Sequence, residues 1–188
     1  MRDYSKPRQV FILAGLSESG KSYAGMFFDK RGVKRLKYVK LFAREQLKEN
    51  PEINPYKLLE QSDLPEEEQV QRAVRSLKDI CESEDIPYCS IESMVKPSTA
   101  IALKKAIGED KVKIIYFEID EEIRLHRQME RESVDYEVAK RIMLPRDQKK
   151  IIFGTTKIKE IADIVIDNSG TKDDLNQKLL KLIDKYCR

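Results

Sequence analysis

One short stretch constrains this chain more than any other: the octapeptide GLSESGKS, from Gly15 to Ser22, which matches the pattern G-x-x-x-x-G-K-[ST]. An apolar, strand-like run at residues 10–14 precedes it, and residues 22–30 read as a helix. A strand, a glycine-bounded loop and a helix N-terminus are the context that this phosphate-binding motif requires. The sequence therefore predicts a nucleotide-binding loop, and the rest of the chain must fold around it.

The chemistry of the loop follows from its residue types. Gly15 and Gly20 let the backbone curl so that successive N–H groups point inward at phosphate oxygens. The helix that follows adds free N–H groups and the positive end of its dipole. Lys21 can reach the β- and γ-phosphates, and the Ser22 hydroxyl can bind Mg²⁺. The acidic Glu18 is tolerable only if its side chain points away from the nucleotide. The loop residues expected to bind the nucleotide are Gly15, Ser17, Ser19, Gly20, Lys21 and Ser22.

Composition narrows the function classes. The 188 residues are enough for a single domain, 1–188, and 40% hydrophobic with 37% charged residues indicates a soluble globular protein. A net charge of +3 does not suggest a nucleic-acid binder, and no run approaches the roughly 18 apolar residues that span a membrane. Cys81, Cys89 and Cys187 lack C-x-x-C spacing, which fits free thiols in a reducing cytoplasm. Nothing in the sequence indicates an oligomeric state.

Strands and helices alternate along the chain. Apolar runs predict strands at residues 10–14, 33–39, 86–91, 112–119 and 164–166. Helical patterns cover residues 22–30, 40–49, 97–107 and 121–132, a stretch beginning at Pro65, and a terminal helix capped by Thr171. Residues 133–152 read as a basic helical region interrupted by Pro145. This alternation predicts an α/β fold, a parallel sheet with helices on both faces.

Ligands of such sheets bind beyond the carboxyl ends of the strands. The phosphate loop, Glu92, Asp120 and Asn168 all follow predicted strands. We therefore expect them to share one cleft.

The loop predicts a nucleoside triphosphate but not its use. A GTP switch needs an N-K-x-D base-reading motif, which this chain lacks, and a motor or helicase would normally need a longer chain. A small-molecule kinase is the class that remains.

A basic region between the fourth and fifth predicted strands supports a kinase. It contains Arg124, Arg127, Arg131, Lys140, Arg141, Arg146, Lys149 and Lys150. Arginines stabilise the charge that phosphoryl transfer develops, and a mobile lid that carries them would exclude water. Arg127, Arg131 and Arg141 are the preferred candidates. The alternative is a solvated charged helix face, because glutamates are interleaved with the arginines.

Other candidate residues lie near strand ends. Glu92 could hold Mg²⁺ or accept the proton of the attacking hydroxyl, and it could equally be an ordinary surface or helix-capping acid. Lys96 and Arg44 could each bind a substrate phosphate.

With these residues identified, the chain resembles the P-loop nucleoside monophosphate kinase superfamily. Its carboxy-terminal third is most similar to dephospho-CoA kinases and to uncharacterised nucleotide-kinase-like proteins related to them. The resemblance is carried by the phosphate loop and by residues 125–131, 139–142, 146–147 and 162–171, the last of which is similar to an A-D-x-V-I-x-N-x-G ending.

The resemblance implies a P-loop NTPase three-layer fold with a five-stranded parallel core, a substrate-binding helical region near residues 40–84 and a lid near residues 127–150. It implies ATP with Mg²⁺ as phosphoryl donor, and matches Arg127, Arg131 and Arg141 to lid arginines. It also implies that Asn168 and Gly170 lie beside the adenine, and that Arg44 binds the acceptor phosphate.

Three functions stay open at this stage. The first is a kinase that transfers the γ-phosphoryl group of ATP to a nucleotide or nucleotide-like small molecule. The second is a dephospho-CoA kinase. The third is an ATP-binding module that acts as a sensor or binds a partner, without kinase activity.

Overall fold

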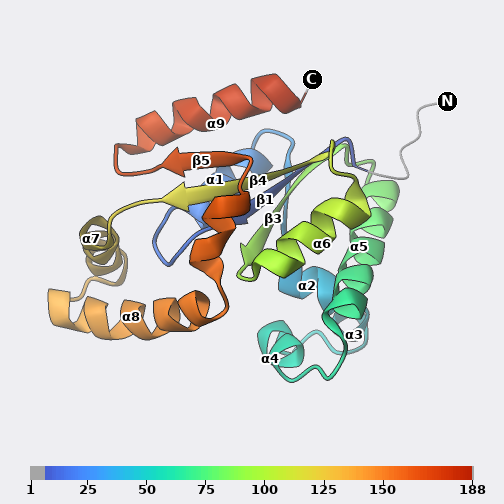
Figure 1. Cartoon of the computed structure of the whole chain (residues 1–188), viewed down its shortest axis with the longest axis horizontal. Coiled ribbons are helices and arrows are strands. Elements are labelled where there is room, and N and C mark those ends of the chain that lie inside the picture. Colours follow the sequence, from blue (N-terminus) through green and yellow to red (C-terminus); the bar gives the residue numbers. More distant parts are fainter. Residues whose placement is uncertain (1–6, 188) are drawn as a thin grey trace.

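The computed structural model describes residues 7–187, which form a five-stranded parallel sheet with the strand order β2-β3-β1-β4-β5 (Figure 1). β1 lies at the centre, and β2 and β5 are the two edges. The strands are β1 (Gln9–Ala14), β2 (Lys34–Lys37), β3 (Tyr88–Met94), β4 (Val112–Glu118) and β5 (Ile164–Asp167). Every neighbouring pair is parallel. The predicted α/β fold with a five-stranded parallel sheet is confirmed.

Helices cover both faces of the sheet. α1 (Lys21–Asp29) and α9 (Lys172–Tyr186) pack on one face, and α5 (Glu66–Ser83) and α6 (Pro97–Ile107) pack on the other (Figure 1). The other helices are α2 (Tyr38–Phe42), α3 (Arg44–Glu49), α4 (Pro55–Glu60), α7 (Glu121–Glu132), α8 (Tyr136–Ile152) and the 3₁₀ helix η1 (Thr155–Ile161).

The central strand supplies side chains to two separate cores. All six residues of β1 are buried. Val10 and Ile12 belong to the cluster beneath α5 and α6, whereas Phe11 and Leu13 belong to the cluster beneath α1 and α9. Successive side chains of a strand point to opposite faces, so a strand covered on both faces must be apolar throughout. This explains the continuous apolar run that precedes the glycine-bounded loop.

Several predicted element ends are confirmed. α6 begins at Pro97 and ends before Gly108, and α7 occupies residues 121–132. α9 begins after Thr171, whose hydroxyl accepts from the Asp174 N–H while the Asp174 carboxylate accepts from the Thr171 N–H. This reciprocal capping box satisfies two amide groups that the helix itself leaves without partners.

Three expectations were wrong in detail. The helix predicted at residues 40–49 is divided at Ala43 into α2 and α3, because Ala43 has a backbone outside the regular helical values. Pro145 does not interrupt the basic helical region, since α8 continues through it from Tyr136 to Ile152. The third strand runs to Met94 rather than ending at residue 91, so Glu92 lies within β3.

Among residues 7–187, no helix combines the length and the apolar character needed to cross a bilayer.

Candidate functional site

The glycine-bounded loop connects β1 to α1, at the carboxyl edge of the sheet. Gly15 opens it with a φ of 142°, and Gly20 ends it with a φ of 96°, directly before the first residue of α1. A Cβ atom at position 20 would also clash with the Asn168 side-chain amide. Both the backbone conformation and the available space therefore require glycine at position 20.

Lys21 folds back over the loop to which it belongs. Its ammonium donates hydrogen bonds to the Leu16 carbonyl and to the Ser19 hydroxyl, the latter at 3.0 Å. Burial of the ammonium, together with the nearby positive charge of Lys150, lowers the pKa of Lys21 to about 7. An anion bound in the loop would reverse this shift, because it would stabilise the charged form of Lys21.

Ser17 anchors the loop to the region carboxy-terminal to β4. Its N–H donates to Asp147 Oδ1 at 2.8 Å, and its carbonyl accepts from Arg124 Nη1 at 3.2 Å. Arg124 and Asp147 form an ion pair, and both side chains are only 4% exposed. The Ser17 hydroxyl accepts from Lys150 Nζ at 2.7 Å. The described structure thus ties α7 and α8 to the loop through buried, charged contacts.

The side chain of Glu18 pairs with an arginine of α7. The residue has a left-handed backbone with a φ of 56°, and its Oε1 accepts from Arg131 Nη1 at 2.5 Å. Arg131 is therefore brought to the loop, where it neutralises this carboxylate.

Arg127 and Asn168 connect the loop to the end of β5. Arg127 Nη2 donates to the Asn168 carbonyl at 2.8 Å, and Asn168 Nδ2 donates to the Ser19 carbonyl at 2.9 Å. Asn168 is buried, whereas Gly170 is exposed in the turn that leads to α9. α7, the loop and the β5 end therefore form one hydrogen-bonded unit.

Glu92 meets the loop from β3. Its Oε2 lies 3.5 Å from the Ser22 hydroxyl, and the Arg35 guanidinium binds both carboxylate oxygens, at 2.5 Å from Nε and 3.0 Å from Nη2. The carboxylate sits against α1 at Gly25, where a Cβ atom would clash with Glu92 Oε1. Glu92 is 3% exposed, so Arg35 offsets a buried charge.

Ser22 and Glu92 fit a magnesium ion. A hydroxyl oxygen and a carboxylate oxygen close together at the start of α1 are the donors that Mg²⁺ takes from protein, with water and phosphate oxygens completing its octahedron.

The remaining candidates lie apart from this network. Arg141 is exposed on α8. Arg44 donates to the Ser76 carbonyl at 3.4 Å and to Asp79 at 3.1 Å. Lys96 Nζ lies 5.7 Å from the centre of the Phe153 ring. No hydrogen bond or ion pair among the described residues links Arg44, Lys96 or Arg141 to the phosphate loop.

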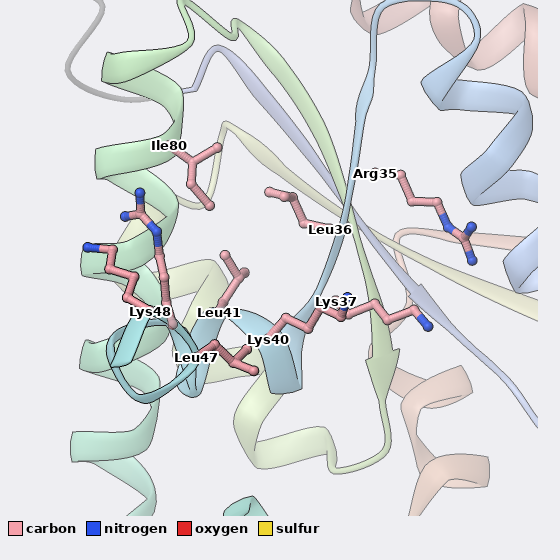
Figure 2. Close-up of a pocket in the computed structure, with 9 residues that line it drawn as sticks. Arg35, Leu36, Lys37, Lys40, Leu41, Leu47, Lys48 and Ile80 are labelled. Atoms are coloured by element: carbon pink, nitrogen blue, oxygen red, sulfur yellow. The ribbon is translucent and has the colours of Figure 1, made fainter. Parts of the chain in front are cut away.

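Arg44 lines a cavity of about 450 Å³ at the β2 edge of the sheet. Figure 2 shows Leu36 of β2 and Ile80 of α5 facing each other across it, with Leu41 and Leu47 below and Lys48 at its side. The walls combine apolar side chains with cationic ones.

Sequence reasoning missed Arg35, Gly25 and Asp147. Arg35 lies in a four-residue strand in which three residues are basic, and Asp147 was part of the family resemblance without an assigned role. An isolated glycine inside a helical pattern was the one usable signal, because a glycine there costs helix stability and requires a packing reason. At Gly25 the packing reason is that the absence of a Cβ atom leaves space for the Glu92 carboxylate.

Comparisons with known proteins identify the fold. The chain matches no protein-family model. It is 25% identical over 182 residues to a UPF0200 protein from Thermococcus gammatolerans, an alignment that covers 95% of this chain and 96% of the relative.

Two solved kinases share the architecture. A shikimate kinase from Acinetobacter baumannii, in complex with shikimate, has a TM-score of 0.57 at 15% identity and covers 97% of this chain and 96% of its own. A sugar kinase from Janibacter sp. has a TM-score of 0.59 at 15% identity and covers 95% of both chains. At this level of identity the comparison shows that the chain has the P-loop kinase-like fold.

Proposed function

We propose that this chain is an ATP-dependent small-molecule kinase, which transfers the γ-phosphoryl group to a nucleotide or nucleotide-like acceptor. The observation that carries the proposal is the loop itself. A buried ammonium, Lys21, lies over a glycine-bounded turn, and the hydroxyl–carboxylate pair of Ser22 and Glu92 lies beside it. The likeness to shikimate and sugar kinases supports the reaction class.

In this proposal the loop holds the phosphates of ATP. The N–H groups of the loop and of the first turn of α1 donate to phosphate oxygens, and Lys21 neutralises the terminal phosphates. Asn168 and Gly170 would lie beside the adenine. The bond between Arg127 and the Asn168 carbonyl supports a role for Arg127 in holding that end of the nucleotide.

Ser22 and Glu92 would hold Mg²⁺, which neutralises charge on the phosphates when bound. Glu92 is aligned for this role by Arg35 and by the space at Gly25. Because Glu92 lies beside the Ser22 hydroxyl, we assign it to metal binding rather than to proton acceptance from the attacking hydroxyl.

In this proposal Arg131 and Arg141 close the site over the bound phosphates. Arg131 can move from Glu18 to a phosphate oxygen, because it is half-exposed and the two positions share the same loop. Arg141, which is exposed on α8, is assigned the same function in a closing lid. Water exclusion by this lid would favour transfer over hydrolysis.

The acceptor is assigned to the helical region at residues 40–84 and to Lys96. Arg44 and the mixed basic and apolar walls of the cavity beside it fit an anionic acceptor with an apolar or planar portion. Dephospho-CoA belongs to this chemical class, as do nucleoside monophosphates.

The test is ADP release from Mg-ATP across a panel of nucleoside monophosphates, deoxynucleoside monophosphates, dephospho-CoA and shikimate. We expect one acceptor class to stimulate ADP release, and Lys21→Ala to abolish the stimulation. A flat panel from protein that binds ATP would reject the kinase assignment for these acceptors, and would favour an ATP-binding module.

A further inference from the structure

The phosphate loop contacts a second ammonium group, which comes from α8. Lys150 Nζ lies 2.7 Å from the Ser17 hydroxyl, while Lys21 Nζ lies 3.0 Å from the Ser19 hydroxyl. Both amines are largely removed from water, and each accordingly has a lowered pKa. The positive charge of Lys150 disfavours the charged form of Lys21, so an anion bound between the two amines would stabilise the charged form of both.

The carboxylates around the loop do not provide that anion. Asp147 pairs with Arg124, Glu18 pairs with Arg131, and Glu92 pairs with Arg35. Lys150 approaches Asp147 Oδ1 only at 3.9 Å, and that oxygen already accepts from the Ser17 N–H. Each of these three acids thus lies closer to an arginine than to Lys150, and Arg124 and Arg131 also contact Glu121 and Glu132.

The contacts of α8 with the loop place Lys150 next to the Ser17 hydroxyl. Asp147 lies one helical turn before Lys150, on the same face of α8. Its bonds to the Ser17 N–H and to Arg124 are buried, and fix this turn of α8 against the loop. Arg141, by contrast, is exposed on α8, and Lys149, the neighbour of Lys150, is exposed as well.

We propose that Lys150 binds the terminal phosphate of the nucleotide, as a second cation beside Lys21, and that the Arg124–Asp147 pair positions it. The inference deepens the proposed kinase function and rests on it. When a triphosphate enters, the Lys150 ammonium exchanges the Ser17 hydroxyl for a γ-phosphate oxygen. Lys21 reaches the β- and γ-phosphates, and Lys150 meets the same end of the nucleotide because both ammonium groups donate to hydroxyls of the same loop, at Ser19 and Ser17.

The test compares ATP with ADP, because only ATP carries the γ-phosphate. Binding of each nucleotide to the full chain is measured by calorimetry in the presence of Mg²⁺. We expect Lys150→Ala to weaken ATP binding roughly 10-fold or more, the scale of one lost charge-assisted hydrogen bond, and to change ADP binding less than about 2-fold. Lys149→Ala, the matched control on the same helix, should change neither affinity. Equal losses for ATP and ADP, or no loss, would overturn the role of Lys150.

Asp147 is tested as a positioning residue. Asp147→Asn keeps the size of the side chain but weakens its pairing with Arg124. We expect the preference for ATP over ADP to fall while ADP still binds, and the double variant with Lys150→Ala to show no further fall. Additive losses in the double variant would contradict the positioning role. If Asp147→Asn fails to fold, Lys150→Arg provides the second arm, since it should retain most of the ATP preference.

The same data separate the two proposals. Wild-type protein that binds neither nucleotide would overturn the kinase function and the role of Lys150 together. Wild-type protein that binds ATP, with affinity unchanged in Lys150→Ala, would overturn only the role of Lys150.

Discussion

At the scale of single residues, the lowered pKa of Lys21 leads to a prediction that can be measured. Its pKa of about 7 lies well below that of a free lysine, so above pH 7 the amine is largely neutral in the empty loop. Phosphate binding favours the ammonium and raises this pKa. We therefore predict that ATP binding takes up protons between pH 7 and about pH 10, and that ATP affinity falls as the pH rises through this window.

The measurement is the heat of ATP binding at pH 8, in two buffers with different ionisation enthalpies. A difference between the buffers reports the uptake, which should approach one proton per nucleotide for Lys21. Below pH 6 the difference should vanish, since the amine is already charged in the free protein. Lys150→Ala separates any contribution of the second amine, whose pKa is also lowered by burial. Identical heats in the two buffers at pH 8 would contradict a neutral Lys21.

A second prediction at this scale concerns the effect of replacing Gly25 with alanine. In an exposed helix, Gly→Ala would stabilise by about 1 kcal/mol. Here the added Cβ meets Glu92 Oε1, whose carboxylate is also fixed by Arg35. We predict that Gly25→Ala destabilises the protein by about 1–3 kcal/mol and weakens the Mg²⁺ dependence of ATP binding.

Denaturant unfolding measures the stability change, and Met26→Ala is the matched control, because Met26 is the next residue of α1 and is 46% exposed. A Gly25→Ala variant as stable as wild type, with the same Mg²⁺ dependence, would show that Glu92 does not need this space.

The residues also show how far the sequence could predict the site. The loop from Gly15 to Ser22 was predictable because its glycines, lysine and serine stand at fixed local spacing. The bond between Ser17 and Asp147 joins residues 130 positions apart, and the pair of Arg35 with Glu92 joins residues 57 apart. No local pattern records such pairings, since only the folded sheet brings them together.

At the scale of elements, α8 contains a proline in its interior. Pro145 lacks the N–H that would bond the carbonyl four residues earlier, and its ring crowds that carbonyl, which usually costs about 3 kcal/mol. Proline also restricts the unfolded chain, which offsets about 0.4–1 kcal/mol of this cost. We predict that Pro145→Ala stabilises the protein by about 2 kcal/mol.

Thermal unfolding followed by circular dichroism measures this change. The control is Gln148→Ala, another exposed position of α8, which should alter stability by less than about 0.5 kcal/mol. If Pro145→Ala is neutral or destabilising, the helix must already relieve the strain at that carbonyl.

Element ends were predictable where a local signal sets them. Pro97 and Gly108 bound α6, and Thr171 caps α9. The break at Ala43 was not predictable, because α2 is held by packing: its residues Tyr38 and Leu41 are buried in the cluster beneath α5. The continuation of α8 through Pro145 likewise reflects tertiary anchoring at Asp147, which outweighs the local preference to stop.

At the scale of the whole molecule, the loop is a junction between distant parts of the chain. It joins β1 to α1, meets β3 through Glu92, the β5 end through Asn168, and α7 and α8 through Ser17. The apolar runs predicted the strands, and their alternation with helical segments predicted that the strands are parallel. The strand order depends on which side of β1 each crossover packs, and that is decided by the two separate cores rather than by any single stretch.

A ligand in this junction should therefore stabilise the whole fold. A nucleotide that binds only the folded state at about 100 times its dissociation constant adds roughly 2.7 kcal/mol. For a chain of this length, this corresponds to a rise in melting temperature of about 5–10 °C. We predict such a rise with Mg-ATP, measured by differential scanning calorimetry. Lys21→Ala should lose it, because the bound phosphates then lack their main countercharge, whereas Lys149→Ala should keep it. A wild-type melting temperature unchanged by saturating Mg-ATP would contradict nucleotide binding at the loop.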